Sequence, residues 1–329
     1  MMSRRRMMMM SALSKKEDIP VWDGTTVTTP KIVDGMYEIY DAATWLGYIQ
    51  MGDQYIWGNV TADFAFNANW EDWESWGTTP PSNVYPSMDK IICGIHGNGH
   101  SVYGIYQKSG SGPIVGYLIS GLDKIRILGV YKQERCGISV CDTSNSTTVV
   151  KDIVCAGYFS GYSSFAESLL GGGKNILMFG DFMYGLDSSF CSGIVNKSST
   201  LYNCAAVGSL IIGWTGDGNF EAGLVNGNAT LYGCWSSVDF KNADGGYISG
   251  RSTLASGSAT MPSECYYDSV RSADATQKQG TPKTTAEIKS QAFVDTLNAN
   301  IDSDANLSGC TKWKLQTKGM LAGWPDLDF

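Results

Sequence analysis

A stretch of this sequence repeats with a period of about 30 residues, which limits the folds open to the chain. The letters SGIVN at 192–196 and TLYNC at 200–204 return as AGLVN at 222–226 and TLYGC at 230–234. Short apolar runs broken by Gly and Asn at a fixed spacing are typical of stacked β coils. One such repeat cannot bury its apolar face alone, so neighbouring repeats must stack. The repeat therefore predicts a single-stranded parallel β solenoid.

The composition agrees with an all-β chain. It has 39 Gly, 17 Tyr and 10 Trp, with 43% hydrophobic and only 17% charged residues. Many short strands with tight turns give this profile, whereas a helical or disordered chain does not. The expected strand-like runs are 114–118, 125–131, 149–155, 176–179 and 210–214. Coil openings are expected near Gly94, Gly116, Gly137, Ala166, Gly193, Gly223 and Gly250, which makes on the order of six or seven coils.

The chain divides into four predicted parts: a flexible arm at 1–20, an N-terminal cap at 21–90, coils at 91–269, and a linker with a cap helix at 270–329. In the first cap, 37–40 reads as a strand, and Asp41 as the N-cap of a short helix. In the second, 284–287 reads as a capping box. It opens a helix with an apolar stripe of Ile288, Ala292, Leu297 and Ile301. Both open ends of a solenoid need such covers.

Charge and the first residues bear on partners and location. The net charge is −8 and the isoelectric point about 4.8, which disfavours nucleic acid and anionic membranes as partners. The one basic cluster, 4–6, lies in the arm. The apolar stretch at 7–13 is short for a secretory signal and has no small-residue cleavage site after it. No segment has the length of a membrane span.

The cysteines and histidines predict neither a disulfide framework nor a metal site. Cys155, Cys204, Cys234 and Cys265 each follow a strand-like run, which favours buried thiols stacked along the solenoid. His96 and His100 flank a Gly-Asn-Gly turn and have no third ligand nearby. Asp217, Asn219 and Glu221 alternate and could offer oxygens to calcium, but the pattern does not repeat, so we favour a plain turn. We expect no metal and no cofactor.

A tryptophan-rich loop at 67–81 is the one candidate binding site. Three aromatic rings alternate in it with three carboxylates: Trp70, Glu71, Asp72, Trp73, Glu74 and Trp76. Ring faces can stack on sugars while carboxylates accept hydroxyl hydrogens, so the loop could contact a glycan. A carboxylate pair at a suitable separation could also hydrolyse a glycosidic bond. The alternative is that the rings form a local core over the cap. We predict no catalytic residue.

The repeats resemble the GLUG-motif repeats of bacterial surface and phage-associated proteins. The similarity rests on Gly-Leu/Ile-Val followed by Thr-Leu-x-x-Cys, and on the flanking segments 62–64, 97–104, 265–269, 284–297 and 323–325. It spans roughly 37–325, although the coils at 136–161 and 165–186 depart from the motif. The resemblance implies a right-handed parallel β-helix with an adhesive or structural role. It implies no common active site.

Three functions follow as alternatives. The first is a non-enzymatic phage tail or fibre component that binds a bacterial surface glycan or protein, joins other virion proteins through its arm and forms a homo-oligomer in some cases. It would be made in the cytoplasm and act on the virion. The second is a GLUG-type adhesin on the bacterial cell surface. The third is a polysaccharide lyase or depolymerase, which the sparse Lys and Arg of the coils disfavour. We predict the first.

Overall fold

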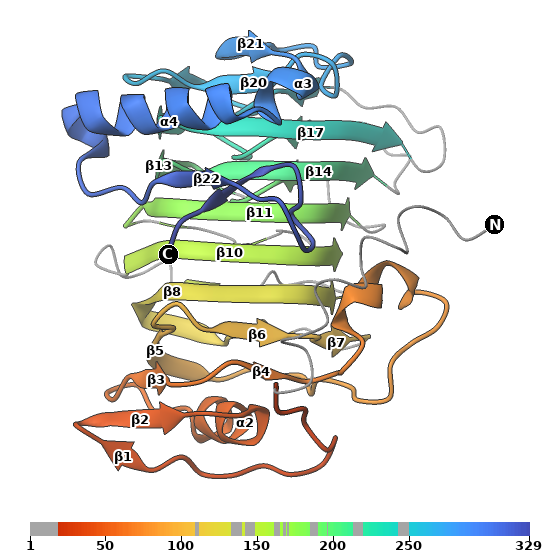
Figure 1. Cartoon of the computed structure of the whole chain (residues 1–329), viewed down its shortest axis with the longest axis vertical. Coiled ribbons are helices and arrows are strands. Elements are labelled where there is room, and N and C mark those ends of the chain that lie inside the picture. The colour runs from red at the N-terminus through yellow and green to blue at the C-terminus, as the bar shows by residue number, and fades with distance from the viewer. Residues whose placement is uncertain are drawn as a thin grey trace.

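The computed structural model describes residues 19–108, 112–132, 140–141, 149–160, 165–166, 169, 171–184, 190–195, 197–212, 220–242 and 250–329. Residues 1–18 of the predicted arm lie outside these ranges, as do Gly137 and Asn196. The chain is mainly β, with 42% strand and 14% helix, and most of its strands join one large, mostly parallel sheet. The predicted predominance of parallel strands is confirmed. Figure 1 shows these strands stacked from β1 at one end to β21 at the other.

The elements follow one another in short steps along the chain. They are β1 (Ile32–Val33), β2 (Met36–Ile39), α2 (Ala42–Met51), β3 (Gly58–Val60), β4 (Phe64–Ala65), η2 (Trp70–Ser75), β5 (Ile91–His96), β6 (Ser101–Tyr103), β7 (Tyr106–Gln107), β8 (Tyr117–Lys132), β9 (Val140–Cys141), β10 (Val149–Ser160), β11 (Gly173–Tyr184), β12 (Phe190–Ser192), β13 (Ser199–Tyr202), β14 (Ala205–Ile212), β15 (Phe220–Ala222), β16 (Ala229–Tyr232), β17 (Trp235–Asn242), β18 (Gly250–Ser252), β19 (Ala259–Thr260), β20 (Tyr266–Asp268), β21 (Thr281–Lys283), α3 (Thr285–Ile288), α4 (Gln291–Ser303), η3 (Ala305–Leu307), β22 (Trp313–Leu315) and β23 (Pro325–Leu327).

The sequence repeat sets the register of the strands. In the repeat region, β13 pairs with β16, β14 with β17, and β12 with β15, all parallel. Residues of one repeat lie opposite the same residues of the next, as Leu201 does opposite Leu231. Hydrogen bonds between neighbouring repeats, such as that from the Ser258 amide to Asn228, join residues 30 positions apart. Side chains of one kind therefore form columns across the strands.

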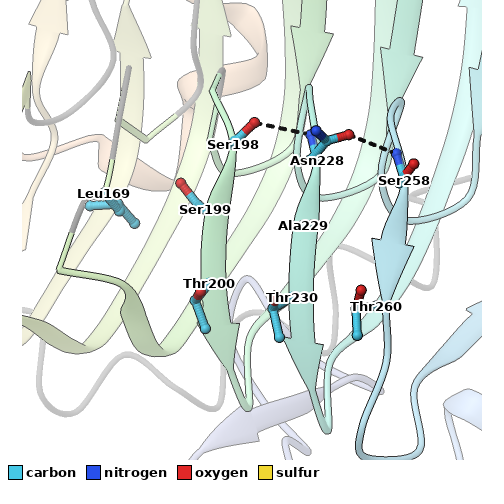
Figure 2. A pocket seen from close by; sticks show the side chains of 9 residues that line it. All are labelled: Leu169, Ser198, Ser199, Thr200, Asn228, Ala229, Thr230, Ser258 and Thr260. Carbon is cyan, nitrogen blue, oxygen red and sulfur yellow. Dashed lines mark hydrogen bonds between the residues drawn. The ribbon is translucent and has the colours of Figure 1, made fainter.

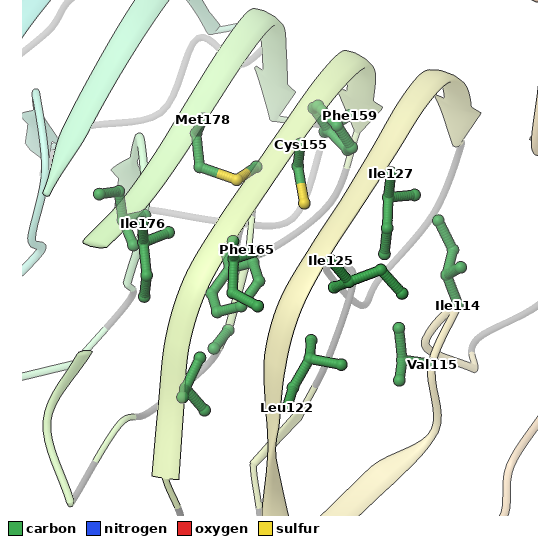
Figure 3. Close-up of a cluster of buried hydrophobic side chains, with 14 of the residues drawn as sticks. Ile114, Val115, Leu122, Ile125, Ile127, Cys155, Phe159, Phe165, Ile176 and Met178 are labelled. Atoms are coloured by element: carbon green, nitrogen blue, oxygen red, sulfur yellow. The ribbon is translucent and has the colours of Figure 1, made fainter. Parts of the chain in front are cut away.

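The inward columns are apolar and form the main core. Ile125, Ile153 and Ile176 lie opposite one another on β8, β10 and β11, and all three are fully buried. Figure 3 shows this part of the core, where Phe165 and Met178 fill the space between strands. Burying one such side chain stabilises the fold by roughly 1.5–3 kcal/mol. The apolar core thus adds to the backbone hydrogen bonds that join the strands.

Buried thiols continue these columns, as predicted. The cysteines that the structure describes as free, Cys93, Cys155, Cys204, Cys234, Cys265 and Cys310, are all buried. The Cys204 amide donates a 3.5 Å hydrogen bond to Cys234 Sγ across adjacent repeats. Burial raises the pKa of the Cys155 and Cys265 thiols above the usual range. These cysteines are core residues and poor nucleophiles.

Helix α2 confirms the helix predicted after Asp41. The Asp41 side chain accepts from the Thr44 backbone amide, and the Thr44 hydroxyl accepts from the Asp41 backbone amide. Gly52 ends the helix in the left-handed region at φ 64°. Gly47 lies so close to the backbone of Thr28 that a Cβ would clash with it. Almost every side chain of α2 is buried, so the helix closes the N-terminal end of the core.

The C-terminal helix differs from its prediction in three ways. The capping box at Thr284 is present, but α3 ends after one turn, and Ser290 starts a second helix, α4, by accepting from the Phe293 amide. Ala292 is exposed, because Phe293 and Val294 take the inward face together with Leu297 and Ile301. Helix α4 also packs on a face of the sheet, where Phe293 meets the rings of Trp235 and Tyr266. The predicted end cap is thus a cover over the side of β17 and β20 (Figure 1).

Candidate functional site

The tryptophan-rich loop folds around a short 3-10 helix, η2, which buries its three rings. Trp70 and Trp73 are 7% and 6% exposed, and Trp76 is fully buried. Trp70 packs on Tyr103 with ring centroids 4.6 Å apart, and Trp76 meets Tyr106 edge to face at 5.9 Å. The rings belong to one apolar cluster with Ala65, Tyr106 and Tyr131. This burial is the local core that the sequence offered as the alternative.

The carboxylates of the loop lie on its other side. Glu71, Asp72 and Glu74 are exposed, while the rings between them face inward. The structure therefore separates the two halves of the predicted sugar site. Glycan contact through this loop stays a prediction, and the burial of the rings argues against ring stacking as its basis.

The two histidines each face a carboxylate of their own. His96 Nδ1 lies 3.0 Å from Asp123, and its ring stacks on Trp57 with centroids 4.1 Å apart. His100 Nδ1 lies 3.0 Å from Asp63. Within the described ranges, no group of three or more potential ligands surrounds a common point for a metal ion. The His96 contact joins β5 to β8, and the His100 contact joins the turn before β6 to the segment before β4.

Of the calcium candidates, Asp217 and Asn219 lie outside the described residues, and Glu221 is enclosed. Glu221 on β15 is fully buried, and Arg251 on β18 donates to its Oε2 from Nε at 2.6 Å. Burial raises the pKa of Glu221 to about 7, although the guanidinium of Arg251 opposes this shift. Arg251 also lies 3.6 Å from the exposed Asp274. Glu221 thus forms a buried contact with Arg251 that joins β15 to β18.

A column of threonines on three neighbouring repeats lines an open groove on the described surface. Thr200, Thr230 and Thr260 lie opposite one another on β13, β16 and β19. They line a shallow groove of about 430 Å³, seen in Figure 2. No hydrogen bond joins their hydroxyls to a group in the described part of the chain. Neighbouring strands of a sheet are about 4.8 Å apart, so one hydroxyl recurs at each such step.

The rim and floor of this groove are neutral. Along the rim, the Asn228 amide donates to Ser198 Oγ at 3.1 Å, and the Ser258 amide donates to Asn228 Oδ1 at 2.9 Å. These bonds fix the edge of the groove across three repeats (Figure 2). Leu169 and Ala229 add apolar surface. None of the described residues that line the groove carries a charge. It therefore offers hydrogen bonds without an acid or a base.

The sequence did not lead us to predict this groove, although the Thr-Leu-Tyr pattern of the repeat indicates it. In Thr-Leu-Tyr, the Leu of each repeat is buried and the flanking Thr and Tyr face outward. The tyrosines form a column as well, since Tyr202 and Tyr232 stack with centroids 4.7 Å apart. Reading the repeat residue by residue with the two-residue alternation of a strand would have placed Thr200 and Thr230 on the surface. Thr260 departs from the motif, so only the pairing with Thr230 adds it.

Comparison with protein-family models, with curated proteins and with solved structures finds no match to this chain. The resemblance to GLUG-motif repeats therefore rests on the residues quoted above and stays a prediction. In the described part of the chain, no helix is both long and apolar enough for a membrane span.

Proposed function

We propose that this protein is a non-enzymatic, right-handed β-helix that presents a binding surface for glycans. Strands of successive repeats pair in parallel at a spacing of 30 residues, and the inward columns form a continuous apolar core. A chain that returns to the same column at each turn is what a β-helix requires. Helix α2 supports the proposal further, because it covers the core at the first end of the stack.

The threonine groove carries the functional part of the proposal. Its open hydroxyls recur in register on three neighbouring repeats, so a ligand that spans them must itself present polar groups at regular intervals. An extended, neutral polysaccharide has this property. Glycosidic bond cleavage in most hydrolases needs paired carboxylates, and the described lining of the groove has no ionisable side chain. Binding without cleavage is the function that this lining supports best.

The setting that fits such a surface is the outside of a particle or cell. We propose a phage tail or fibre component that meets a bacterial surface glycan, with a bacterial cell-surface adhesin as the alternative setting. Both would use the same groove, so the choice between them does not change the chemistry of the site. The acidic net charge of −8 favours neutral or cationic ligands over anionic ones.

A glycan array tests the proposal, with the same incubations analysed for released sugar fragments. We expect binding to extended neutral glycans and no fragments. Release of fragments would overturn the non-enzymatic assignment. Absence of any glycan binding would overturn the adhesive role and leave only a scaffold.

A further inference from the structure

A second depression lies where the tryptophan-rich loop meets the C-terminal segment. It has a volume of about 220 Å³ and is lined by residues of η2, β6 and β8 together with the turn and strand at 316–326. Residues far apart in the sequence, in η2 and at 316–326, therefore line the same cleft. It is separate from the threonine groove, with which it shares no lining residue.

A buried ion pair builds the base of the cleft. Arg126 Nη1 donates to Asp326 at 2.9 and 3.1 Å, and its Nη2 donates to the Leu327 carbonyl at 2.6 Å. Asp326 is fully buried, and the Arg126 side chain is 13% exposed. Gln316 Nε2 adds a 3.1 Å bond to Asp326. Because removal of one partner would leave the other charge buried and unpaired, this pair fixes the C-terminal segment firmly against β8.

The Arg126 contacts leave donor capacity. They engage only its terminal nitrogens, so the Nε–H has no acceptor among the described residues. The Arg126 guanidinium also lies over the Phe329 ring, 4.9 Å from its centroid. A fixed guanidinium of this kind presents its remaining donors in one plane without loss of further side-chain freedom.

The walls of the cleft are of two kinds. Tyr103, Leu128 and Met320 contribute partly exposed apolar surface, while Trp70 and Leu321 beside them are mostly buried. Glu71 and Lys318 bring opposite charges to its lining, and both side chains are exposed. Arg126 and Asp326 carry opposite charges as well, so the formal charge of these four residues sums to zero. A ligand with one apolar face and several hydroxyl groups, and without net charge, matches such a lining.

We propose that this cleft binds a single neutral pyranose unit, such as the end of a glycan chain. Pockets for drug-sized ligands measure about 300–1,000 Å³, so a cleft of about 220 Å³ takes one ring rather than an oligosaccharide. The apolar wall receives the C–H face of the ring, while Glu71 accepts from hydroxyl groups and Lys318 and Arg126 donate to them. The inference that the ligand is a sugar rests on the proposed function. The cleft adds a second glycan-binding site to the threonine groove.

Titration of the full chain with methyl pyranosides, followed by ligand-observed NMR, tests the inference. We expect saturable binding of one or a few of these sugars. The substitution Lys318→Ala removes a donor at an exposed position and should weaken binding about tenfold or more, as expected for a charged hydrogen bond. Lys278→Ala, another exposed lysine but remote in sequence from the cleft residues, should leave binding unchanged.

The same titrations separate this inference from the groove. Binding of a monosaccharide that is insensitive to Lys318→Ala and to Glu71→Gln would overturn the cleft as its site. Binding of longer glycans that is lost on substitution of Thr230, with no monosaccharide binding, would overturn the cleft and preserve the proposed function. Saturable binding of a free amino acid in place of any sugar would also overturn the inference.

Discussion

Two polar columns run across neighbouring strands of the sheet, and only one of them is covered. Asp152, Asn175 and Asn203 form one column, and all three are buried. Asn175 Nδ2 donates to Asp152 at 2.6 Å, and Asn203 Nδ2 donates to Asn175 Oδ1 at 2.8 Å. The other column is that of Thr200, Thr230 and Thr260, whose hydroxyls meet no described partner. Both columns are polar and in register, but only the first is covered.

The C-terminal segment makes the difference. Thr311 Oγ1 donates to Asp152 at 2.6 Å, and Trp313 Nε1 donates to Asn203 Oδ1 at 2.6 Å. A buried polar side chain costs about 1–3 kcal/mol if it is left unpaired, so a covered column must be fully bonded. An open column is under no such demand, because water or a ligand can bond to it. Columns of the first kind stabilise the fold, and columns of the second kind are available for recognition.

The largest expected effect comes from the tryptophan loop, where buried and open positions also alternate. Trp76→Ala should reduce the free energy of unfolding by about 3–5 kcal/mol, as typical for a fully buried tryptophan. Glu74→Ala, at an exposed position of the adjoining helix η2, should change it by less than about 0.5 kcal/mol. Chemical denaturation measures both. Equal stability of Trp76→Ala and wild type would show that the ring is not part of the core, and would restore the stacking hypothesis.

The next effect concerns the covered column. Asn203→Ala leaves Trp313 Nε1 and Asn175 Oδ1 without their partner, which should cost about 2–4 kcal/mol. The substitution also places alanine at φ 54°, a region that asparagine tolerates better. Thermal unfolding followed by circular dichroism measures the loss. A change of only a few tenths of a kcal/mol would mean that the column does not stabilise the fold.

A buried carboxyl group with a shifted pKa, Glu221, makes the stability of the fold depend on pH. The pKa of Glu221 is raised to about 7 from an ordinary value of 4.5, so its protonated form is the one that the fold favours. The resulting stability is fully present below about pH 4.5 and is lost as the pH rises through 7, by at most about 3 kcal/mol. Glu221→Gln should lack this component.

Stability curves of both proteins between pH 4.5 and 8 provide the measurement. The stability of the variant relative to wild type should increase as the pH rises. A constant difference across this range would show that the Glu221 pKa is the same in the folded and unfolded chains.

The smallest effect is expected in the open column. Thr230→Ala should change the free energy of unfolding by less than about 0.5 kcal/mol, because its hydroxyl has no described partner within the chain. A loss of 2 kcal/mol or more in chemical denaturation would place Thr230 in the class of the covered column.

The sequence predicted the repeating strands well. It predicted poorly the contacts between distant segments, such as those of the C-terminal segment with the sheet. The spacing of Leu201 and Leu231 gives the strand register, and Asp41 and Thr284 mark helix starts, because these features are local or periodic. The burial of the tryptophan rings depends on Tyr103 and Tyr106 from other strands. The cleft depends on Asp326 reaching Arg126, 200 positions away in the sequence. No local pattern encodes such contacts, since they follow from how the whole chain packs.

The central claim is that the open threonine column recognises a ligand and the covered column only stabilises the fold. The most direct test is the affinity of the triple variant Thr200→Ala, Thr230→Ala, Thr260→Ala for an extended neutral glycan that wild type binds, with thermal unfolding recorded on the same samples. We predict an unfolding temperature close to that of wild type and binding weakened at least about tenfold, as expected for loss of several hydrogen bonds. Unchanged affinity in a folded triple variant would contradict it.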